Sequence, residues 1–240
     1  MDQDPRTLCI DIGGSGIKTL VVGTDGKALT GRQRADTPQP ATPKAVVKTI
    51  LDLAKKQGAF DRVSVGFPGV VRQGVVETAF NLHKDWIGVN LDEALTKALE
   101  KPVRAANDAD VQGLGAIKGE GLELVITLGT GFGSALFMDG RLVPNVQLGH
   151  HAGWGEKTYE DELGNKALKK AGKKKWNKRL RKAIGSLAAL FNYDRLYIGG
   201  GNAARIKFEL PPRVKIVSNE EGLFGGLALW KGKENSYGVH

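Results

Sequence analysis

The sequence predicts an α/β protein made of two related lobes with mixed sheets. Apolar runs of strand length alternate with helical patterns along the chain, which is typical of α/β proteins. Each half also opens with two apolar runs joined by a glycine-rich turn, and such an internal repeat indicates two lobes of similar build. The two turns are Asp11-Ile-Gly-Gly-Ser-Gly-Ile-Lys18 and Leu128-Gly-Thr-Gly-Phe-Gly-Ser134.

Local signals place the elements of the first half. Residues 7–34 predict strands joined by turns, with Thr24-Asp-Gly-Lys27 as a hairpin turn. Thr42 can cap a helix that starts at Pro43, keeps helical apolar spacing over residues 45–56 and ends at Gly58. Strands are then expected at residues 62–66 and 102–106, and helices at residues 91–99 and after Asn107-Asp108.

The second half repeats this order. A strand, a glycine turn and a strand occupy residues 123–138, and two basic helices are expected at residues 158–170 and 174–190. Strands at 195–198 and 214–217 and a last helix at 223–230 complete the chain. Since no low-complexity linker separates the halves, we expect the boundary near residue 110 to lie at a helix hinge. The N-terminal lobe would then be residues 1–110 and the C-terminal lobe residues 111–240. A return of the last helix to the N-terminal lobe is compatible with this division.

Composition indicates a soluble, cytoplasmic protein. Of 240 residues, 41% are hydrophobic and 25% are charged, which is ordinary for a globular chain. No apolar run approaches the roughly 18 residues that span a bilayer, and the polar start is unlike a signal peptide. Cys9 is the only cysteine, so an internal disulfide and a cysteine-rich zinc site are excluded.

Both glycine turns are candidate phosphate sites. A glycine-rich hairpin tip exposes backbone N–H groups, because glycine allows close approach and positive φ, and such groups bind phosphate oxygens. The hydroxyls of Ser15, Thr130 and Ser134 flank them. Ordinary hairpin turns are the alternative. The pairing of two such loops favours two lobes that hold one polyanionic substrate.

The net charge of +9 is concentrated in one segment. Ten basic residues lie within residues 166–182 with no acid among them: Lys166, Lys169, Lys170, Lys173, Lys174, Lys175, Lys178, Arg179, Arg181 and Lys182. They form either a solvated helix face or an electrostatic guide for a polyanion, such as a phosphate polymer. Nucleic acid is not expected as a partner, because no known nucleic-acid-binding motif accompanies the charge.

Eight short segments in the same order make the chain resemble the sugar kinases of the actin-like ATPase superfamily, which have a ribonuclease H-like fold with a cleft between two lobes. The similarity is greatest to the ROK family (repressors, open reading frames and kinases) and within it to the polyphosphate glucokinase branch. The segments are residues 11–18, Thr37-Pro-Gln-Pro-Ala-Thr-Pro43, Gly66-Phe-Pro-Gly69, Asn81-Leu82 with Trp86-Ile-Gly88, Asn107-Asp-Ala-Asp110, Leu128-Gly-Thr-Gly131, Val143-Pro-Asn145 with Leu148-Gly-His150, and Ile198-Gly-Gly-Gly201.

The resemblance assigns roles to particular residues. It implies that Asp108 is the catalytic base, although Asn107 and Asp108 could also simply cap the next helix. Asp11 would position Mg²⁺ or act as a turn residue, and Lys18 would face phosphate or solvent. The phosphate and nucleotide contacts would be Asp11, Gly13, Gly14, Ser15, Gly16, Lys18, Thr130, Gly131, and the adenosine-side loop Gly199, Gly200 and Gly201, for which a plain strand-to-helix turn is the alternative.

The sugar contacts implied by the resemblance are Gly69, Asn81, Asn107, Asp108, Gln147, His150 and Glu160. One position departs from the family, which usually has glutamate where this chain has Gln147. An amide still donates and accepts hydrogen bonds but has no charge, so the choice of sugar stays open.

The leading hypothesis is therefore a glucose-type hexose kinase that uses Mg²⁺ with polyphosphate, ATP or both, and the resemblance favours a homodimer. A non-catalytic sugar- or phosphate-binding protein of the same fold is the first alternative. A sugar-responsive regulator is the second. The resemblance implies that such regulators carry an N-terminal helix-turn-helix module, and the ten residues before Asp11 are too few for one, so this alternative is disfavoured.

Overall fold

The computed structural model describes residues 4–218 and 224–231. The chain divides into two units, the first comprising Met1–Gly115 with Glu220–His240 and the second Ala116–Asn219. Each unit contains a five-stranded mixed sheet, and both sheets have the same strand order, in which the third, second, first, fourth and fifth strands are neighbours. The predicted repeat of one α/β plan is therefore present.

The sheet of the first unit has the order β3-β2-β1-β4-β7. The strands are β1 (Thr7–Ile12), β2 (Ile17–Val22), β3 (Gln33–Ala35), β4 (Arg62–Phe67) and β7 (Val103–Asn107). Strands β1, β2 and β3 are antiparallel neighbours, whereas β1, β4 and β7 run parallel. The carboxyl ends of β1, β4 and β7 therefore lie at one edge of the sheet.

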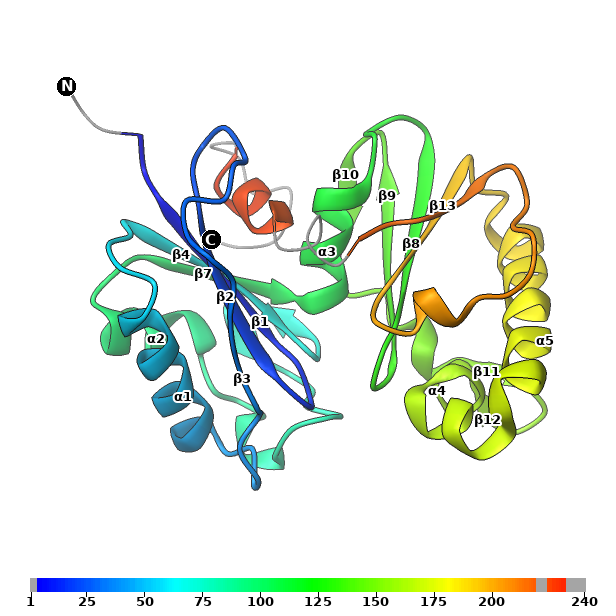
Figure 1. Ribbon diagram of the computed structural model, residues 1–240, viewed down its shortest axis with the longest axis horizontal. Helices are drawn as coiled ribbons and strands as arrows, with labels where there is room; N and C mark the ends of the chain where they lie inside the picture. Colours follow the sequence, from blue (N-terminus) through cyan, green and yellow to red (C-terminus); the bar gives the residue numbers. More distant parts are fainter. Residues whose placement is uncertain (1–3, 219–223, 232–240) are drawn as a thin grey trace. The chain divides into compact units, whose positions relative to one another are not determined.

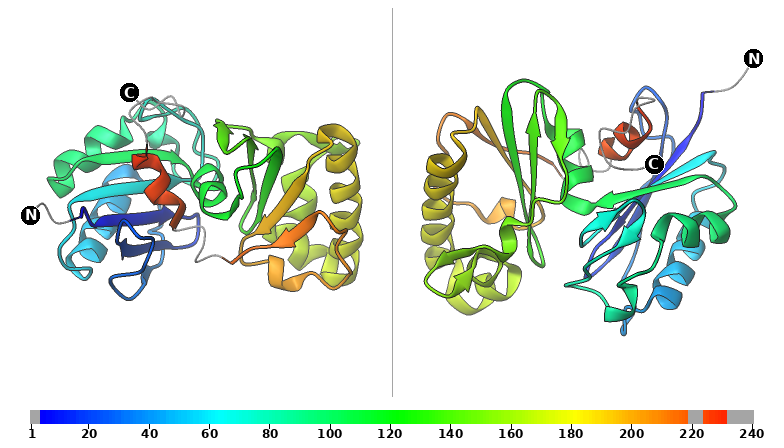
Figure 2. Two further views of the ribbon diagram at one scale, coloured as in Figure 1. Left: turned by 90° about the horizontal axis from the view of Figure 1, so that it is seen from above. Right: turned by 180° about the vertical axis from the view of Figure 1, so that it is seen from behind.

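Two helices cover one face of this sheet (Figure 1). Helix α1 (Pro43–Lys55) and helix α2 (Leu91–Leu99) bury apolar side chains against Leu8 and Ile10 of β1. The other face is covered by the 3₁₀ helix η4 (Gly225–Trp230), drawn red in Figure 2, where Leu227 packs on Cys9. Alternate residues of β1 thus serve two cores, as the period of a strand requires.

The remaining elements of the first unit are short, apart from α3. They are the hairpin β5 (Val71–Arg72) and β6 (Val75–Val76), the 3₁₀ helix η1 (Lys84–Trp86) and helix α3 (Asp108–Ala116), whose last residue belongs to the second unit. Trp86 is fully buried, and its indole N–H donates to Ala41 O. This bond fixes the Thr-Pro-rich segment against the body of the unit.

The sheet of the second unit has the order β10-β9-β8-β13-β14. Its strands are β8 (Leu122–Leu128), β9 (Phe132–Met138), β10 (Arg141–Val143), β13 (Arg195–Gly199) and β14 (Val214–Ile216). Helices α4 (Tyr159–Leu163) and α5 (Asn165–Phe191) lie along one face (Figure 1). Trp176 and Leu180 of α5 are fully buried there, against Leu124 and Ile126.

Short elements complete the second unit: the 3₁₀ helices η2 (Leu148–His150) and η3 (Ala203–Arg205), and the hairpin β11 (Ala152–Trp154) and β12 (Lys157–Thr158). Among the described residues, no helix is both long and apolar enough to cross a membrane.

Most predicted elements are confirmed, and one helix prediction is wrong. The helix expected at 158–170 ends at Leu163, because the chain leaves the helical conformation at Gly164 before α5 begins. The expected break between two basic helices is confirmed, because Gly172 has a non-helical backbone (φ 76°, ψ 158°) and divides α5 into two helical segments. The last helix is also confirmed over its described residues, mostly as the 3₁₀ helix η4, and its expected start at Leu223 lies outside them.

Candidate active site

Asp11 and Asp108 come together at the carboxyl edge of the parallel strands in the first unit. Asp11 on β1 pairs with Gly66 on β4, and Gly66 pairs with Ala106 on β7, two residues before Asp108. A Cβ atom on Gly66 would lie only 3.3 Å from the Cα atom of Asp108. The glycine therefore makes room for the second carboxylate, at the edge where ligands bind in open α/β sheets.

The environment of Asp108 shifts its protonation toward neutral pH. Burial and then the nearby Asp11 carboxylate raise the pKa of Asp108 to about 7, and Asp110 acts in the same direction. The backbone N–H of Ala109 donates to Asp108 Oδ1 at 2.8 Å, which opposes this rise. A carboxyl group with a pKa near 7 can accept a proton during a reaction at neutral pH.

Asn107 makes three hydrogen bonds within the protein. Its side-chain oxygen accepts from the backbone N–H groups of Ala109 (2.9 Å) and Asp110 (3.2 Å), which caps the start of α3. Its side-chain nitrogen donates to Gly69 O at 3.0 Å, and the residue is buried. Asn107 therefore caps α3, and the same side chain ties the Gly69 loop to the start of α3, while its sugar contact stays a prediction.

The Gly69 loop is held by close backbone contacts. A Cβ on Gly69 would lie 2.0 Å from Thr78 O, so no other residue fits without moving the chain. The hydroxyl of Thr78 in turn accepts the Val70 N–H at 2.8 Å. Asn81 is partly exposed three residues further along this segment.

The first glycine loop, residues 13–16, is the tight turn between β1 and β2. Gly13 N–H donates to Gly16 O at 3.0 Å, and the Thr37 hydroxyl donates to Gly13 O. Gly13 and Gly16 do not have positive φ, so the expectation that these glycines are needed for positive φ is wrong at both positions. Close approach is the operative reason, because a Cβ on Gly13 would lie 2.9 Å from Gly16 O.

A row of three charged residues crosses the sheet beside this loop. Asp11 pairs with Lys18 on β2, and Lys18 pairs with Arg34 on β3. Lys18 Nζ lies 2.8 Å from Asp11 Oδ2, so Lys18 faces this carboxylate rather than only solvent. Arg34 Nη2 donates to Ser15 O at 3.2 Å, and its guanidinium lies against Gly16. Sequence reasoning missed Arg34, because only the strand register reveals its position.

The second glycine loop, residues 129–131, is the turn between β8 and β9 in the second unit. Gly129 N–H donates to Gly131 O at 3.1 Å, and the side-chain nitrogen of Asn202 donates to Gly129 O. Gly200 has φ 85°, and its Cβ would lie 2.4 Å from Leu128 O. The Gly199–Gly201 segment, predicted to be an adenosine-side loop, therefore packs directly on the second glycine loop.

Glu160 and the Gly149-His150 pair lie on the same side of β9. Glu160 Oε2 accepts the Phe132 N–H at 3.1 Å, one residue after the second glycine loop. A Cβ on Gly149 would lie 2.3 Å from Phe132 O, so η2 packs closely on this strand. His150 is exposed, and Gln147 is partly exposed with its carbonyl accepting the His150 N–H.

Ser134, which flanks the second glycine turn in the sequence, has a structural position. Its hydroxyl donates to Val146 O at 2.6 Å and accepts the Leu148 N–H at 2.9 Å. The residue is buried. It therefore anchors η2 to β9.

The predicted residues thus form two groups, one in each unit. The first unit holds Asp11, Gly13, Gly14, Ser15, Gly16, Lys18, Gly69, Asn81, Asn107 and Asp108, and the second holds Thr130, Gly131, Gln147, His150, Glu160, Gly199, Gly200 and Gly201. Within the described ranges 4–218 and 224–231, no cluster of three or more histidine, cysteine or acidic side chains could hold a metal. The partly exposed Asp11 carboxylate nonetheless fits Mg²⁺, which uses few protein oxygens and keeps several waters.

The strand order and the two hairpin loops define the class of protein: a two-lobed α/β protein of the actin-like ATPase fold. The model of the ROK family matches residues 7–167. A polyphosphate glucokinase of Mycobacterium tuberculosis strain H37Ra is 39% identical over 206 residues, which cover 82% of this chain and 77% of the relative. The chain therefore belongs to the ROK family, and the predicted fold class and family are both confirmed.

Solved structures agree with this assignment. The crystal structure of an inorganic polyphosphate/ATP-glucomannokinase from Arthrobacter sp. strain KM matches with a TM-score of 0.86 and 34% identity, covering 94% of this chain and 98% of that one. A ROK family glucokinase from Streptomyces griseus, solved with glucose and AMPPNP, matches with a TM-score of 0.76. Its identity is 20% over 93% of this chain and 98% of the neighbour, so it supports the fold alone.

Proposed function

We propose that this protein transfers the terminal phosphoryl group of polyphosphate or ATP to the 6-hydroxyl of a glucose-type hexose, with Asp108 as the general base. The reaction class rests on the similarity to the polyphosphate glucokinase and the polyphosphate/ATP-glucomannokinase. The single observation that carries the mechanism is the position of Asp108, next to Asp11 and at the carboxyl edge of three parallel strands.

Asp108 would accept the proton of the attacking hydroxyl. Phosphoryl transfer depends mainly on positioning and charge neutralisation, and a correctly placed base contributes about 10²- to 10⁴-fold. Because its pKa is raised to about 7, the carboxylate form that accepts a proton predominates above that pH. Activity should therefore rise with pH through about 7 and then level off.

Asn107 and Gly69 would set the geometry around this base. Asn107 caps α3 at Asp108 and bonds to Gly69 O. Since its oxygen accepts two bonds and one N–H is used, we assign Asn107 a positioning role, and its second N–H can still donate to a sugar hydroxyl beside Asp108, Asn81 and the Gly69 loop. In the second unit, Glu160, Gln147 and His150 remain the proposed sugar-contacting side chains.

The two glycine loops would bind the phosphoryl donor. Arg34 and Lys18 place positive charge beside residues 13–16, which suits a donor phosphate. Asp11 would hold Mg²⁺, which when bound neutralises charge on the transferring phosphoryl group. Near residues 129–131, the N–H groups of the turn offer uncharged donors to phosphate oxygens.

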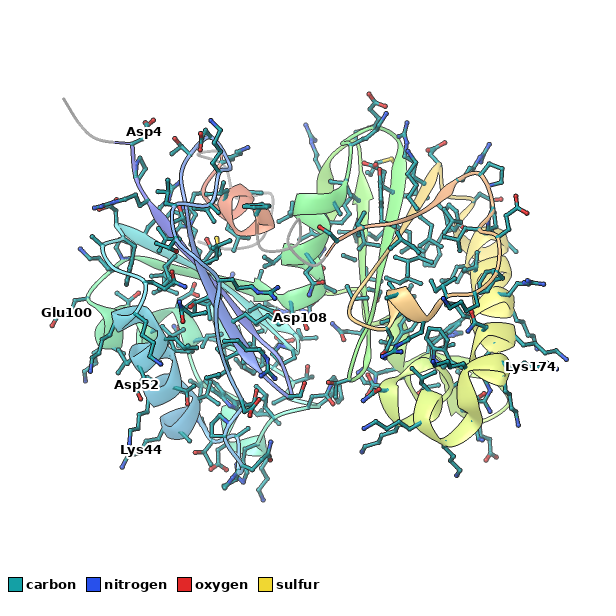
Figure 3. The ribbon with its side chains drawn as sticks, in the orientation of Figure 1. Asp4, Lys44, Asp52, Glu100, Asp108 and Lys174 are labelled. Atoms are coloured by element: carbon teal, nitrogen blue, oxygen red, sulfur yellow. The ribbon has the colours of Figure 1, made fainter. Side chains whose placement is uncertain are left out.

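Asp108→Asn tests this proposal. The asparagine keeps an oxygen that can accept the Ala109 N–H but loses the base, so kcat should fall by about 10³-fold with both donors while KM for the sugar changes little. Asp52→Asn is the matched control, because Asp52 is an exposed acid on α1 that points away from the sheet (Figure 3). Activity of Asp108→Asn near the wild-type value would remove Asp108 from the role of base.

Phosphorylation assays with each donor and common hexoses also decide between a kinase and a binding protein. If sugar binds by calorimetry but no hexose is phosphorylated by either donor, the non-catalytic alternative holds and the kinase proposal fails.

A further inference from the structure

We propose that the exposed side of α5 binds the part of a polyphosphate chain that extends beyond the second glycine loop. This inference rests on the proposed function and specifies how the polymeric donor is held. The lysine tract comprises the exposed side chains Lys166, Lys169, Lys170, Lys173, Lys174, Lys175 and Lys178. It is the densest run of positive charge in the sequence.

The first observation is that the tract lacks compensating charge. Helix α5 contains no acidic residue over Asn165–Phe191. Glu162 lies next to the helix, but its carboxylate is taken by Arg179 and Lys157. Within residues 4–218 and 224–231, no carboxylate forms an ion pair with the seven lysines. The tract therefore presents its charge to solvent, and Lys174 points away from the sheet (Figure 3).

This arrangement is unfavourable for the helix itself. Lys166 and Lys169 lie in the first turns, where the partial positive charge of the helix N-terminus disfavours cations. Lys174 and Lys178 are four residues apart, and like charges at this spacing repel. Burial of Trp176, Leu180 and Leu187 on the opposite side holds the helix in place despite this repulsion. A bound polyanion would relieve it.

The second observation is that the tract is continuous with the second glycine loop. Asn165 N–H, at the first position of α5, donates to Gly129 O at 3.1 Å and to Thr130 O at 3.2 Å. Gly164 packs equally closely, because its Cβ would lie 3.1 Å from Thr130 O. Lys166 is the next residue along the chain. A donor whose end phosphates lie at this loop would therefore leave it beside the start of the tract.

The tract is long enough to distinguish donors. The tract occupies two helical segments that meet at the non-helical Gly172, with Lys166, Lys169 and Lys170 on the first and four lysines on the second. From Lys173 to Lys178 the second segment alone rises roughly 8 Å at 1.5 Å per residue. A long polyphosphate can follow these charges, whereas the triphosphate of ATP ends in a nucleoside. The tract should therefore lower KM for long polyphosphate and leave KM for ATP unchanged.

Two other polyanionic partners fit the tract less well. Single-stranded nucleic acid is usually bound with exposed aromatic side chains on which bases stack, and the aromatic residue inside the tract, Trp176, is fully buried. Membrane-surface helices insert an apolar face into lipid, but the apolar face of α5 packs in the core of the second unit. A linear phosphate polymer needs neither feature.

The test compares three triple variants. Lys174, Lys175 and Lys178 are replaced by glutamine in the distal variant, and Lys166, Lys169 and Lys170 in the proximal variant. Glutamine keeps helix propensity while removing charge. The control replaces three other exposed lysines by glutamine: Lys48 and Lys55 of α1, and Lys56, which caps the end of α1. KM is measured with long-chain polyphosphate, tripolyphosphate and ATP.

We expect the distal variant to raise KM for long-chain polyphosphate about tenfold, and to leave tripolyphosphate and ATP within twofold of wild type. The proximal variant should also raise KM for tripolyphosphate, and the control should change none of the three. Added salt should weaken long-chain binding more in wild type than in the distal variant, because fewer ionic contacts remain there to be screened.

Equal changes with ATP and polyphosphate, or wild-type values in both tract variants, would overturn the inference. Binding of long-chain polyphosphate without sugar, measured by calorimetry, separates the two proposals. If no hexose is phosphorylated, the proposed function fails, while a tract-dependent loss of binding still supports the tract. Tighter tract-dependent binding of single-stranded DNA or anionic vesicles than of polyphosphate would assign the tract to that partner instead.

Discussion

The two glycine loops occupy the same place in two sheets of the same strand order, yet different neighbours hold them. Residues 13–16 are braced by side chains, with the Thr37 hydroxyl on Gly13 O and the Arg34 guanidinium on Ser15 O. Residues 129–131 are braced mainly by backbone from two other segments, through Asn165 N–H and the close packing of Gly200.

The two loops also differ in the charged groups around them. The first loop lies beside Asp11 and Lys18, in the unit that also holds Asp108, so ionisable groups that can act on a reacting phosphate gather there. The second loop leads into the lysine tract, where charge can attract a donor but lies on an exposed helix surface. The repeated fold thus contains two similar loops with different charged surroundings, for which we propose different roles.

The largest difference between the loops should be in stability. Gly200→Ala places a Cβ 2.4 Å from Leu128 O and 2.6 Å from Leu128 N, at φ 85°. We expect it to lower the free energy of unfolding by roughly 3 kcal/mol or more. Gly16→Ala meets only the far end of the exposed Arg34 side chain, which can move, so it should cost less than about 1 kcal/mol. Urea unfolding measures both, and equal costs would contradict this comparison.

Asp108→Asn should make the protein more stable at alkaline pH. The pKa of Asp108 is raised from 3.8 to about 7 in the folded chain. Ionisation of this carboxyl group is therefore less favourable in the folded chain than in the unfolded chain, and it lowers the stability of the fold. This cost grows between about pH 4 and pH 7 and is constant above. We expect the variant to gain roughly 4 kcal/mol at pH 8 and less than about 1 kcal/mol at pH 4.

Thermal or urea unfolding at the two pH values measures this gain, with Asp52→Asn as the control. A gain that is equal at both pH values would show that desolvation of Asp108 is not its cause.

Arg34→Gln should weaken the first loop as a donor site. Loss of the guanidinium beside Gly16 should raise KM about fivefold for ATP and polyphosphate alike, since exposed charge interactions contribute up to about 1 kcal/mol. Arg72→Gln is the control, because Arg72 also forms an exposed ion pair, with Glu77. If KM changed for polyphosphate but not for ATP, Arg34 would instead belong to the site that binds the extended polymer.

Gln147→Glu should have the smallest effect. A carboxylate accepts stronger hydrogen bonds from sugar hydroxyls than an amide does, so KM for glucose should fall about threefold with KM for either donor unchanged. An unchanged or higher KM for glucose would show that position 147 does not contact the sugar.

Local signals in the sequence predicted much of the fold. Helix α1 starts at Pro43 with its cap at Thr42 as expected, because capping depends on residues within one turn. Helix α2 matches its predicted range, Leu91–Leu99, for the same reason. The end of α4 was missed because Gly164 is set by its contact with Thr130, more than thirty residues earlier.

The candidate site was predicted only in part. Motif order pointed to Asp11, Asp108 and the two glycine loops, whereas the roles of Asn107 and Ser134 followed from hydrogen bonds that no motif shows. Arg34 belongs to none of the recognised motifs, and its place beside the first glycine loop followed only from the pairing of β3 with Lys18 on β2.

By itself, therefore, the sequence determined the α/β plan, its repeat and the family, because alternation, capping and glycine spacing are local properties of the chain. Only the tertiary structure decided that Gly66 makes room for Asp108 beside Asp11, and that Asn165 joins the lysine tract to the second glycine loop. Contacts between residues distant in sequence depend on strand register and packing, and the pattern of residues in any one segment does not specify them.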